Sequence, residues 1–412
     1  MTKLKAFVPL LLAVFTDLIG FGIALPVLPG LFLDANGILP IDTSYATRTI
    51  VLGFILGLFP LIQIFSAPIL GALADRHGRK PVLLLSFVGT LVGYLMFAVG
   101  IVTQQLWLLV LGRAIDGATG GNISVASAAI ADLSTEKTRA KNFGLIGMAF
   151  GLGFVIGPFL GGKLSDPSIV SWFSYATPFW FAAILSVLNI ALLAFFFSET
   201  LKTMRPSPVT LMTGIRNIRL AFTMPRVRLL FLVQFLLTLG FTSYTSYMQV
   251  YLIDRFHISQ SGIGDVFGFI GICIALSQGL VARPVADRFT PAAVLRVAPV
   301  GLAATLALVL VPSELKTLFF VFPLMAIFQG LVSTNIMALI SGSADKESQG
   351  EILGLNQSVA SFGQFLPGLF GGAVAAFHPA GPTLLGSILT LAAWIVFVIG
   401  YREKDARRFH EA

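Results

Sequence analysis

The stretch GALADRHGRKPVLLL, Gly71 to Leu85, places a dense group of charges between two long apolar runs. Charged side chains are costly inside a membrane, so this group marks the end of one hydrophobic helix and a short loop to the next. Its charged or titratable members are Asp75, Arg76, His77, Arg79 and Lys80. Basic residues alone would suit a topology anchor, which remains the alternative, but the acidic Asp75 favours a functional role.

The composition of the whole chain indicates a polytopic membrane protein. Hydrophobic residues make up 56% of the 412 residues, charged residues make up 11%, and the mean hydropathy is +0.90. Soluble domains carry about a quarter charged residues. With about 20 apolar residues per span, the chain holds about a dozen helices and no soluble domain. Because Cys273 is the single cysteine, we expect no disulfide framework and no metal cluster. We also expect no cofactor.

Continuous apolar runs predict an all-α protein with twelve transmembrane helices in two pseudo-symmetric six-helix bundles. We expect the first bundle in residues 1–198, a cytoplasmic linker with an amphipathic helix in 199–228, and the second bundle in 229–412. The predicted spans lie near residues 6–31, 48–73, 81–103, 106–131, 141–163, 175–198, 228–252, 261–283, 292–312, 317–341, 350–376 and 380–401.

The distribution of basic residues predicts that both termini are cytoplasmic. Of the 27 Lys and Arg residues, only Arg48, Lys163, Arg255 and Lys316 fall in loops predicted to be external, and Arg113 falls within a span. Cytoplasmic loops carry the excess of basic residues in membrane proteins. The net charge of +8 is therefore a topology signal, and we expect the lipid bilayer, and no nucleic acid, as a partner.

The predicted linker contains a candidate helix that lies on the membrane surface. Ser207 is expected to cap it, with Pro208 at the first helical position. Arg216 and Arg219 fall on one face, and a disordered linker is the alternative. The opposite face is an apolar stripe of Met212, Ile215, Ile218 and Phe222, which is typical of an interfacial helix.

The two halves of the chain repeat each other. ILGALADRHGRKPVLL after the second predicted span is echoed by LVARPVADRFTPAAVL after the eighth, which pairs Asp75 with Asp287. GRAIDGATGGNISVASAAIADLS is echoed by AIFQGLVSTNIMALISGSADKES, which pairs Asn122 with Asn335 and Asp132 with Asp345. A duplicated six-helix unit predicts a binding site between the halves, near the middle of the membrane.

The opening stretch also resembles a known signature. GALADRHGRK is similar to the G-x-L-a-D-r-x-G-r-k motif of the major facilitator superfamily, and LGRAIDGATGG resembles the arginine motif of its fourth helix. GLIGMAFGLGFVIGPFLGG is similar to the fifth helix of its drug:H+ antiporters, and DLIGFGIALPVLP resembles the first helix of the tetracycline antiporters. The resemblance covers the whole chain. It implies a monomeric, proton-coupled antiporter of the bacterial inner membrane that exports a small drug-like compound by alternating access, as in multidrug efflux and antibiotic resistance.

The resemblance implies that the charged loop is a conformational latch. Asp75 is expected at the N-terminus of the eleventh helix, around Gly350, where unpaired N–H groups favour an anion. Arg79 is expected to reach Asp132. Together these contacts would hold the cytoplasmic side shut, with a weaker counterpart in the second half. The predicted latch residues are Gly71, Asp75, Arg76, Gly78, Arg79, Asp132, Asp287, Arg288 and Asp345.

The fifth predicted span is expected to belong to the hinge between the conformational states. Its glycines allow close backbone approach to a neighbouring helix, and structural packing is the favoured interpretation for each glycine taken singly. A proline within the helix is expected to kink it. The predicted hinge residues are Gly144, Gly153, Gly157, Pro158, Gly161 and Gly162.

Three ionisable residues are predicted to share one depth in the membrane. Asp17 lies about 16 Å into the first span, and Arg113 and Asp116 lie about 10 and 15 Å into the fourth. Intramembrane ionisable residues are usually functional, so we expect proton coupling through Asp17, Arg113 and Asp116. The alternative is an Arg113–Asp116 pair neutralised within its own helix, with Asp17 permanently protonated.

Other polar residues within the spans are candidates to line a substrate cavity, although any of them could instead bond a neighbouring helix. They are Gln63, Gln234, Tyr244, Gln329, Asn335, Asn356 and Gln357. A proton-coupled uptake symporter for a metabolite is the alternative transporter. A transporter-like receptor is less favoured, because a latch is of no use to it, and an enzyme is not expected because the spans carry no catalytic motif.

Overall fold

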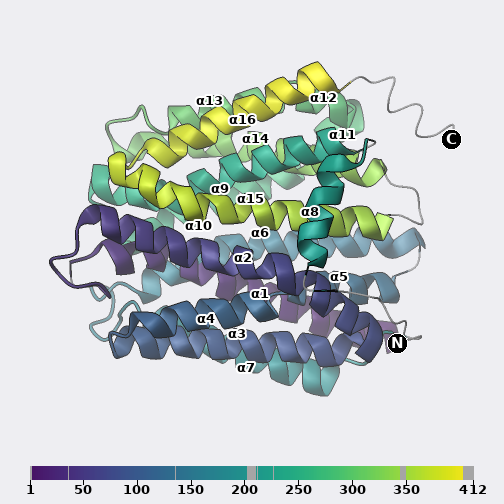
Figure 1. The fold of residues 1–412 in the computed structure, drawn as a ribbon, viewed down its shortest axis with the longest axis horizontal. Coiled ribbons are helices and arrows are strands. Elements are labelled where there is room, and N and C mark those ends of the chain that lie inside the picture. The colour runs from purple at the N-terminus through teal and green to yellow at the C-terminus, as the bar shows by residue number, and fades with distance from the viewer. Residues whose placement is uncertain are drawn as a thin grey trace. The chain divides into compact units, whose positions relative to one another are not determined.

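The computed structural model shows a protein of long helices (Figure 1). It describes residues 2–35, 37–134, 136–201, 210, 212–225, 227–343 and 349–401; side chains are not described for 2–6, most of 136–150, 154 and 349–351. Within this part of the chain no strand is present. Among the described residues, ten helical segments are long and apolar enough to span a membrane. The predicted all-α polytopic fold is confirmed.

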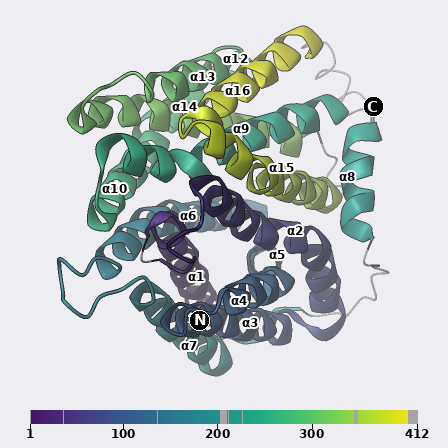
Figure 2. The ribbon, with the colours of Figure 1, turned by 60° about the vertical axis from the view of Figure 1, so that its left-hand side comes forward.

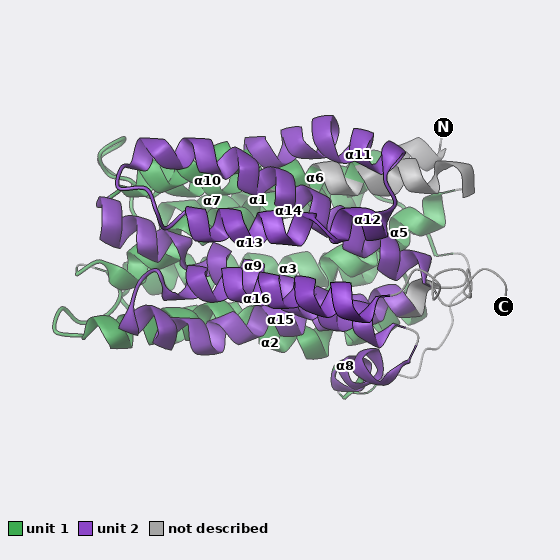
Figure 3. Cartoon of the chain, turned by 90° about the horizontal axis from the view of Figure 1, so that it is seen from above, with its two compact units in different colours: residues 1–214, 258–271 green, residues 215–257, 272–412 purple. Residues whose placement is uncertain are grey.

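The chain divides into two compact units (Figure 3). Unit 1 comprises residues 1–214 and 258–271, and unit 2 comprises residues 215–257 and 272–412. Helix α10 therefore begins in one unit and ends in the other. The boundaries expected from the sequence, at 198 and 229, remain a prediction.

Unit 1 contains the first seven helices and the first turns of α10. Helix α1 packs against α6 and α7, while α3 packs against α4 and α7 (Figure 2). The helices are α1 (Thr2–Leu33), α2 (Tyr45–His77), α3 (Arg79–Val102), α4 (Leu106–Thr119), α5 (Asn122–Leu133), α6 (Glu136–Leu164) and α7 (Thr177–Phe196).

Unit 2 holds most of the remaining helices. Helix α9 packs against α15 and α16, and α13 packs against α14 and α16. The helices of this half of the chain are α8 (Thr213–Thr223), α9 (Arg228–Phe256), α10 (Gln260–Ser277), α11 (Arg283–Arg288), α12 (Pro291–Leu295), α13 (Ala298–Leu308), α14 (Leu315–Gly342), α15 (Gln349–Phe377) and α16 (Gly381–Gly400). A π-helical turn, Gln278–Ala282, joins α10 to α11.

The ninth predicted span is interrupted, and its sequence explains the break. Residues 291–308 form α12 and α13 in place of one continuous helix. Pro299 lacks the N–H that would bond the carbonyl of Leu295, and it disfavours helical geometry in the residue before it. The indole of Trp394 donates to the carbonyl of Arg296 at 2.7 Å, so a neighbouring helix satisfies a backbone group that the break leaves free.

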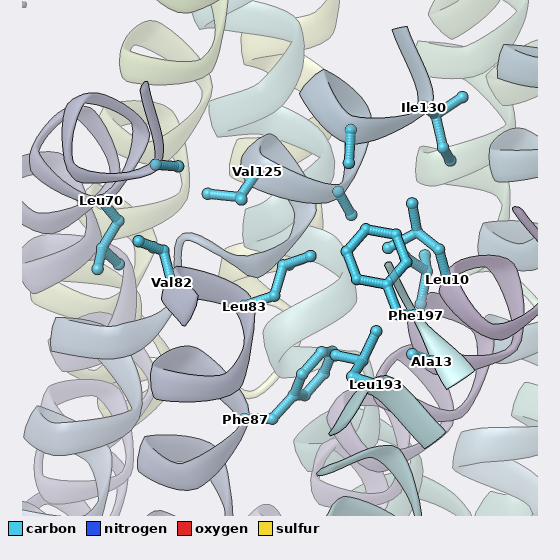
Figure 4. Close-up of a cluster of buried hydrophobic side chains, with 14 of the residues drawn as sticks. Leu10, Ala13, Leu70, Val82, Leu83, Phe87, Val125, Ile130, Leu193 and Phe197 are labelled. Atoms are coloured by element: carbon cyan, nitrogen blue, oxygen red, sulfur yellow. The ribbon is translucent and has the colours of Figure 1, made fainter. Parts of the chain in front are cut away.

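A buried apolar cluster fills unit 1 at the end where α2, α5 and α7 stop and α3 starts (Figure 4). Leu70, Leu83, Phe87, Leu193 and Phe197 lie in it, and each is at most 4% exposed. In a bilayer such a core is stabilised by close packing more than by removal from water. The cluster fixes the helix ends that carry the predicted latch.

Candidate functional site

The fourth predicted span is broken in its middle, and this break shapes the candidate site. Helix α4 ends at Thr119 and α5 begins at Asn122, with Gly120 and Gly121 between them. Glycine destabilises a helix interior. In α2, Gln63 Nε2 donates to the carbonyl of Gly120 at 2.7 Å. Neighbouring side chains thus satisfy the carbonyls that the break exposes, as an apolar environment requires.

Arg113 and Asp116 form a buried ion pair in α4. The guanidinium lies 3.8 Å from the Asp116 carboxylate, and the two residues are 6% and 8% exposed. Thr90 Oγ1 in α3 donates to Asp116 Oδ1 at 3.2 Å. The expected position of the two charges on one helix face is confirmed. Removing one partner of such a pair leaves an uncompensated buried charge, which is strongly destabilising.

Two phenylalanines surround the Arg113 guanidinium. Its central carbon lies 5.5 Å from the ring centre of Phe59 and 5.9 Å from that of Phe97. Both distances fall in the range of cation–π attraction. Arg113 Nε also donates to the carbonyl of Ile55 at 3.4 Å. The cation is therefore held by a carboxylate, two rings and a backbone oxygen, and it is a fixed charge of the site.

Asp17 in α1 has a neutral partner. Asn122 Nδ2, in the first residue of α5, donates to Asp17 Oδ2 at 2.5 Å. Among the described residues Asp17 makes no ion pair. It interacts electrostatically with Asp116, so the structure brings the two carboxyls of α1 and α4 into one region. The break between α4 and α5 places Asn122 where it can reach α1.

Tyr94 in α3 belongs to the same cluster. A Cβ atom added to Gly20 of α1 would lie 2.8 Å from the Tyr94 hydroxyl oxygen, so the hydroxyl lies against the α1 backbone one turn from Asp17. Tyr94 also interacts electrostatically with Asp17, Asp116 and Arg113. Asp17, Thr90, Tyr94, Arg113, Asp116 and Asn122 are called the polar cluster below.

One contact that the predicted latch requires forms in unit 1. Arg79 lies 2.7 Å from the Asp75 carboxylate and 3.2 Å from the Asp132 carboxylate. The expected contact from Arg79 to Asp132 is confirmed. Gly78 is required at its position because its φ is +101°, in the region that favours glycine. Arg76 is exposed, and a Cβ at Gly71 would meet no atom of the described residues within 4 Å.

Glu199, just after α7, completes this cluster at the start of α3. Its carboxylate accepts the backbone N–H groups of Arg79 at 2.9 Å and Lys80 at 3.0 Å. It also accepts those of Thr200 and Leu201, each at 2.9 Å. Burial alone would raise the pKa of Glu199, but these backbone donors outweigh it and hold the pKa below the ordinary 4.5. An anion at a helix N-terminus is stabilised by the unpaired N–H groups there.

The second-half counterpart of the latch shows no such network in the residues that the structure describes. Asp287 and Arg288 are exposed at the end of α11, and no described residue forms an ion pair with either. Asp345 lies outside the described residues, as do the side-chain surroundings of Gly350. The proposed docking of Asp75 on the eleventh helix therefore stays a prediction.

The glycines of α6 lie against the backbone of α1, which confirms the expected close packing. A Cβ at Gly157 would lie 2.7 Å from the carbonyl oxygen of Ile19 and 2.8 Å from Gly22 Cα. Gly153 faces Leu18, Gly161 faces the carbonyl of Ile23, and Pro158 lies next to Gly22. Gly162 faces Gly264 of α10. Gly144 is one of the residues whose side-chain surroundings the structure does not describe.

Several predicted cavity residues bond within their own helix. Gln234 Nε2 donates to Thr238 Oγ1 at 3.0 Å, and Asn335 Nδ2 donates to the carbonyl of Leu331 at 2.7 Å. Gln357 Nε2 lies 3.5 Å from Ser361 Oγ, and Gln329 is half-buried. With Gln63 bonded across to Gly120, these contacts match the alternative of helix bonding. A cavity-lining role for these residues remains a prediction.

Two of the predicted cavity residues in unit 2 carry buried oxygens without a partner among the described residues. These are the Tyr244 hydroxyl and Asn356 Oδ1. Among the described residues, Asn356 Nδ2 donates to Met337 Sδ at 3.8 Å. Gln249, which sequence reasoning missed, is 1% exposed and also has an unpartnered Oε1. Buried polar atoms without partners are rare in native structures and need an explanation.

Comparison with known proteins places the chain in a family. The sequence pattern of the Major Facilitator Superfamily matches residues 10–366, with a second match over residues 230–412. The chain belongs to the major facilitator superfamily. It is a multi-pass membrane transporter, and its relationships point to no class of enzyme.

Two relatives are similar to this chain over most of its length. The chain is 33% identical to the class C tetracycline resistance protein of Escherichia coli over 396 residues, which cover 95% of this chain and 93% of that protein. It is 28% identical to major facilitator superfamily domain-containing protein 10 of Mus musculus, over 88% of this chain and 85% of that protein. The resemblance to the drug:H+ antiporter branch is confirmed.

Solved structures share the fold. The human organic anion transporter MFSD10 (TETRAN) superposes with a TM-score of 0.73 at 24% identity, over 96% of this chain and 99% of that chain. A D-xylose-proton symporter superposes with a TM-score of 0.77 at 15% identity, over 96% and 98%. These likenesses support the fold alone.

Proposed function

We propose that this transporter exports a small lipophilic compound, cationic or zwitterionic, in exchange for protons across the bacterial inner membrane, with Asp17 as the proton carrier. The proposal rests on one contrast within the polar cluster. Asp116 has Arg113 as a charged partner at 3.8 Å, whereas Asp17 has the neutral amide of Asn122. A carboxylate with a fixed cation strongly favours its charged form, but a carboxyl with a neutral partner gains and loses a proton more easily.

The accessibility of the two carboxyls supports the same assignment. Asp17 is only partly buried, whereas Asp116 is 8% exposed. A proton carrier must exchange with water at one stage of the cycle, and intramembrane carboxyls are typical of proton relays. Either a proton or a cationic compound can neutralise the Asp17 carboxylate. Exchange requires that Asp17 bind the proton and the compound in turn, not both at once. Both termini would be cytoplasmic and the transporter would act as a monomer.

The unpartnered oxygens of unit 2 are candidate substrate contacts. Tyr244, Gln249 and Asn356 each bury an oxygen with no partner among the described residues. An incoming hydroxyl or ammonium group would satisfy such an oxygen and recover part of its desolvation cost. The relatives named for tetracycline resistance make tetracycline one compound to include among those tested. The proposal of a cationic or zwitterionic compound rests on the carboxyl of Asp17.

The proposal is tested in proteoliposomes with an imposed pH gradient and a panel of amphipathic drugs and metabolites. Asp17→Asn should abolish uphill transport driven by the gradient, while equilibrium binding of the compound persists and loses its dependence on pH. Asp254→Asn removes an exposed carboxylate at the end of α9 and is the matched control, which should transport normally.

Three results would argue against the proposal. Uphill transport by Asp17→Asn would place the proton route elsewhere, with Asp116 as the next candidate. Accumulation in the same direction as the protons would identify a symporter. Transport that is insensitive to the pH gradient in the unaltered protein would exclude proton coupling.

A further inference from the structure

A second charged cluster lies at the opposite end of α6 from the latch. Helix α6 begins at Glu136, four residues after Asp132, and ends at Leu164. At 1.5 Å per residue its 29 residues span about 43 Å. Its last turn contacts the first turns of α10, which are the part of α10 that belongs to unit 1. Lys163, Asp166, Ser261 and Asp265 form this contact and are called the α6–α10 clasp.

The clasp is made of charge-assisted hydrogen bonds in both directions. Lys163 Nζ lies 2.9 Å from Asp265 Oδ2 and donates to Ser261 Oγ at 2.7 Å. In return, Asp166 Oδ2 accepts the backbone N–H of Ser261 at 3.1 Å. That N–H is one of the unpaired donors of the first turn of α10, so Asp166, in the loop that follows α6, acts as its cap. Lys163 also lies 5.6 Å from the ring centre of Phe159.

The helices meet at glycines beneath these charges. A Cβ added to Gly162 would lie 2.6 Å from Gly264 Cα, and one added to Gly264 would lie 3.0 Å from Gly162 Cα. At Gly30 of α1, a Cβ would lie within bonding distance of the Gln260 side chain. Glycine faces let two backbones touch without interlocking side chains. Two helices in such a contact lie close together, and they can separate without a rearrangement of large side chains.

The exposure of the ion pair also suits a reversible contact. The side chains of Lys163 and Asp265 are 29% and 50% exposed. Pairs of this kind add little to stability because water and salt screen them. The Lys163–Asp265 ion pair therefore orients α10 against α6 but contributes too little free energy to hold the two helices together permanently. The end of α10 from residue 272 belongs to unit 2, so both units share this helix.

We propose that the α6–α10 clasp is a second gate, which holds the end of the transporter remote from Asp75 and Arg79 closed and must open for the compound to pass there. The inference rests on the alternating access of the proposed function. The two gates would work in opposition, one at each end of α6, so that releasing one favours closing the other.

The gate is tested by the rate at which a buried position beneath the clasp reacts with a membrane-impermeant thiol reagent in intact cells. Cys273 is the only cysteine, so Cys273→Ser gives a cysteine-free background. Ser165, 2% exposed at the end of α6, is then changed to cysteine, which is nearly isosteric. In this parent protein we expect slow labelling.

Breaking the clasp should expose the S165C thiol. Lys163→Asp or Asp265→Lys places like charges together, and either should speed labelling about fivefold or more. The exchanged pair, Lys163→Asp with Asp265→Lys, restores opposite charges and should return the rate toward that of the parent. Asp254→Lys makes the same charge change at an exposed carboxylate outside the clasp and should leave the rate unchanged.

The neutral variants Lys163→Gln and Asp265→Asn provide a second series if a charge reversal fails to fold, and each should speed labelling to a smaller degree. The gate is overturned if all single variants label at the parent rate, or if the exchanged pair labels as fast as the single variants. Labelling requires neither compound nor pH gradient. If labelling changes as expected but the protein does not exchange drug for protons, the proposed function is refuted and the gate is not. If labelling is unchanged but exchange is intact, the gate is refuted and the proposed function is not.

Discussion

Glu199 shows at the scale of a single residue how the latch region is held. Its carboxylate joins the start of α3 to the end of α7 through backbone N–H groups of both segments. Thr200 adds a bond to Asp132 at 3.3 Å, and Lys80 Nζ donates to the carbonyl of Ala194 at 2.8 Å. Arg79 is therefore positioned by its own backbone as well as by the two carboxylates that its guanidinium contacts.

Glu199→Gln should lower the unfolding free energy in detergent at pH 7 by about 1 kcal/mol, as loss of a helix cap does. The folded-state pKa of Glu199 lies below the ordinary 4.5, so its stabilisation is present above pH 4.5 and is lost as the pH falls through the folded-state pKa. Thermal unfolding followed at several pH values should show the two proteins converging in acid. A difference that does not shrink as the pH is lowered below 4.5 would contradict this account.

Sequence reasoning located the ionisable residues of the site but not their neutral partners. Asp17, Arg113 and Asp116 stand out because charge is rare in an apolar run, and the structure brings all three into the polar cluster. Asn122, Thr90 and Tyr94 carry no such signal, because a neutral polar residue in a span commonly serves helix packing. The pairing of Asn122 with Asn335 in the internal repeat was the one available hint. Glu199 was missed because its partner is the backbone of another helix.

At the scale of helices, the contact of α1 with α6 depends on glycine. Gly157→Ala should lower the unfolding free energy by about 1–3 kcal/mol, since its methyl would meet the backbone of Ile19 and Gly22, which cannot yield as a side chain can. Gly151 is in the same helix and its added Cβ meets no described atom within 4 Å. Gly151→Ala is therefore the matched control and should be neutral or slightly stabilising. Equal losses from both substitutions would show that helix contact is not the cause.

The break between α4 and α5 gives a second prediction at this scale. Gln63→Leu removes the donor to the Gly120 carbonyl and should lower the unfolding free energy by about 1–3 kcal/mol, the cost of a buried polar group left without a partner. Gln234 bonds only a threonine one turn along its own helix, so Gln234→Leu should cost less. Thermal unfolding of the two variants compares them, and a larger loss from Gln234→Leu would refute the interpretation.

The apolar runs predicted the positions of the helices but not their interruptions. A continuous helix and a broken helix can have the same hydropathy profile, because hydropathy carries no information on backbone hydrogen bonds. Gly120–Gly121 and Pro299 are the physical causes of the two breaks, and only the side chains of other helices make them tolerable. The linker helix was predicted, but it begins at Thr213, and Ser207 and Pro208 lie outside the described residues. Met212 and Ile215 are exposed, and the expected placement on the membrane remains a prediction.

At the scale of the whole molecule, the sequence repeat is accompanied by unequal local structure. The first half bonds Asn122 to Asp17 of another helix, whereas Asn335 at the matching position bonds the backbone of its own helix. The ion pairs of the latch are found in the first half alone among the described residues. The two-bundle arrangement that the repeat predicts stays a prediction, and among the described residues the ion pairs found lie in unit 1.

If the latch and the clasp act in opposition, their variants should compensate. Asp265→Lys is expected to speed labelling of S165C, and adding Asp75→Asn, which weakens the latch at the other end, should slow it again. Asp254→Asn is the control carboxylate substitution and should have no such effect in the same background. Labelling rates that are unchanged by Asp75→Asn would show that the two ends are not coupled.

The division of α10 between the units bears on how the protein is made. Unit 1 includes residues 258–271, which the ribosome adds only after the linker and all of α9. The N-terminal helices therefore wait for a later segment before the glycine face of Gly162 and the carboxylate of Asp166 are covered. During synthesis this face of α6 therefore stays uncovered until residues 258–271 have been made. A truncated chain ending at residue 214 should accordingly be inserted yet recognised by membrane quality control, whereas co-expression of residues 215–412 should protect it.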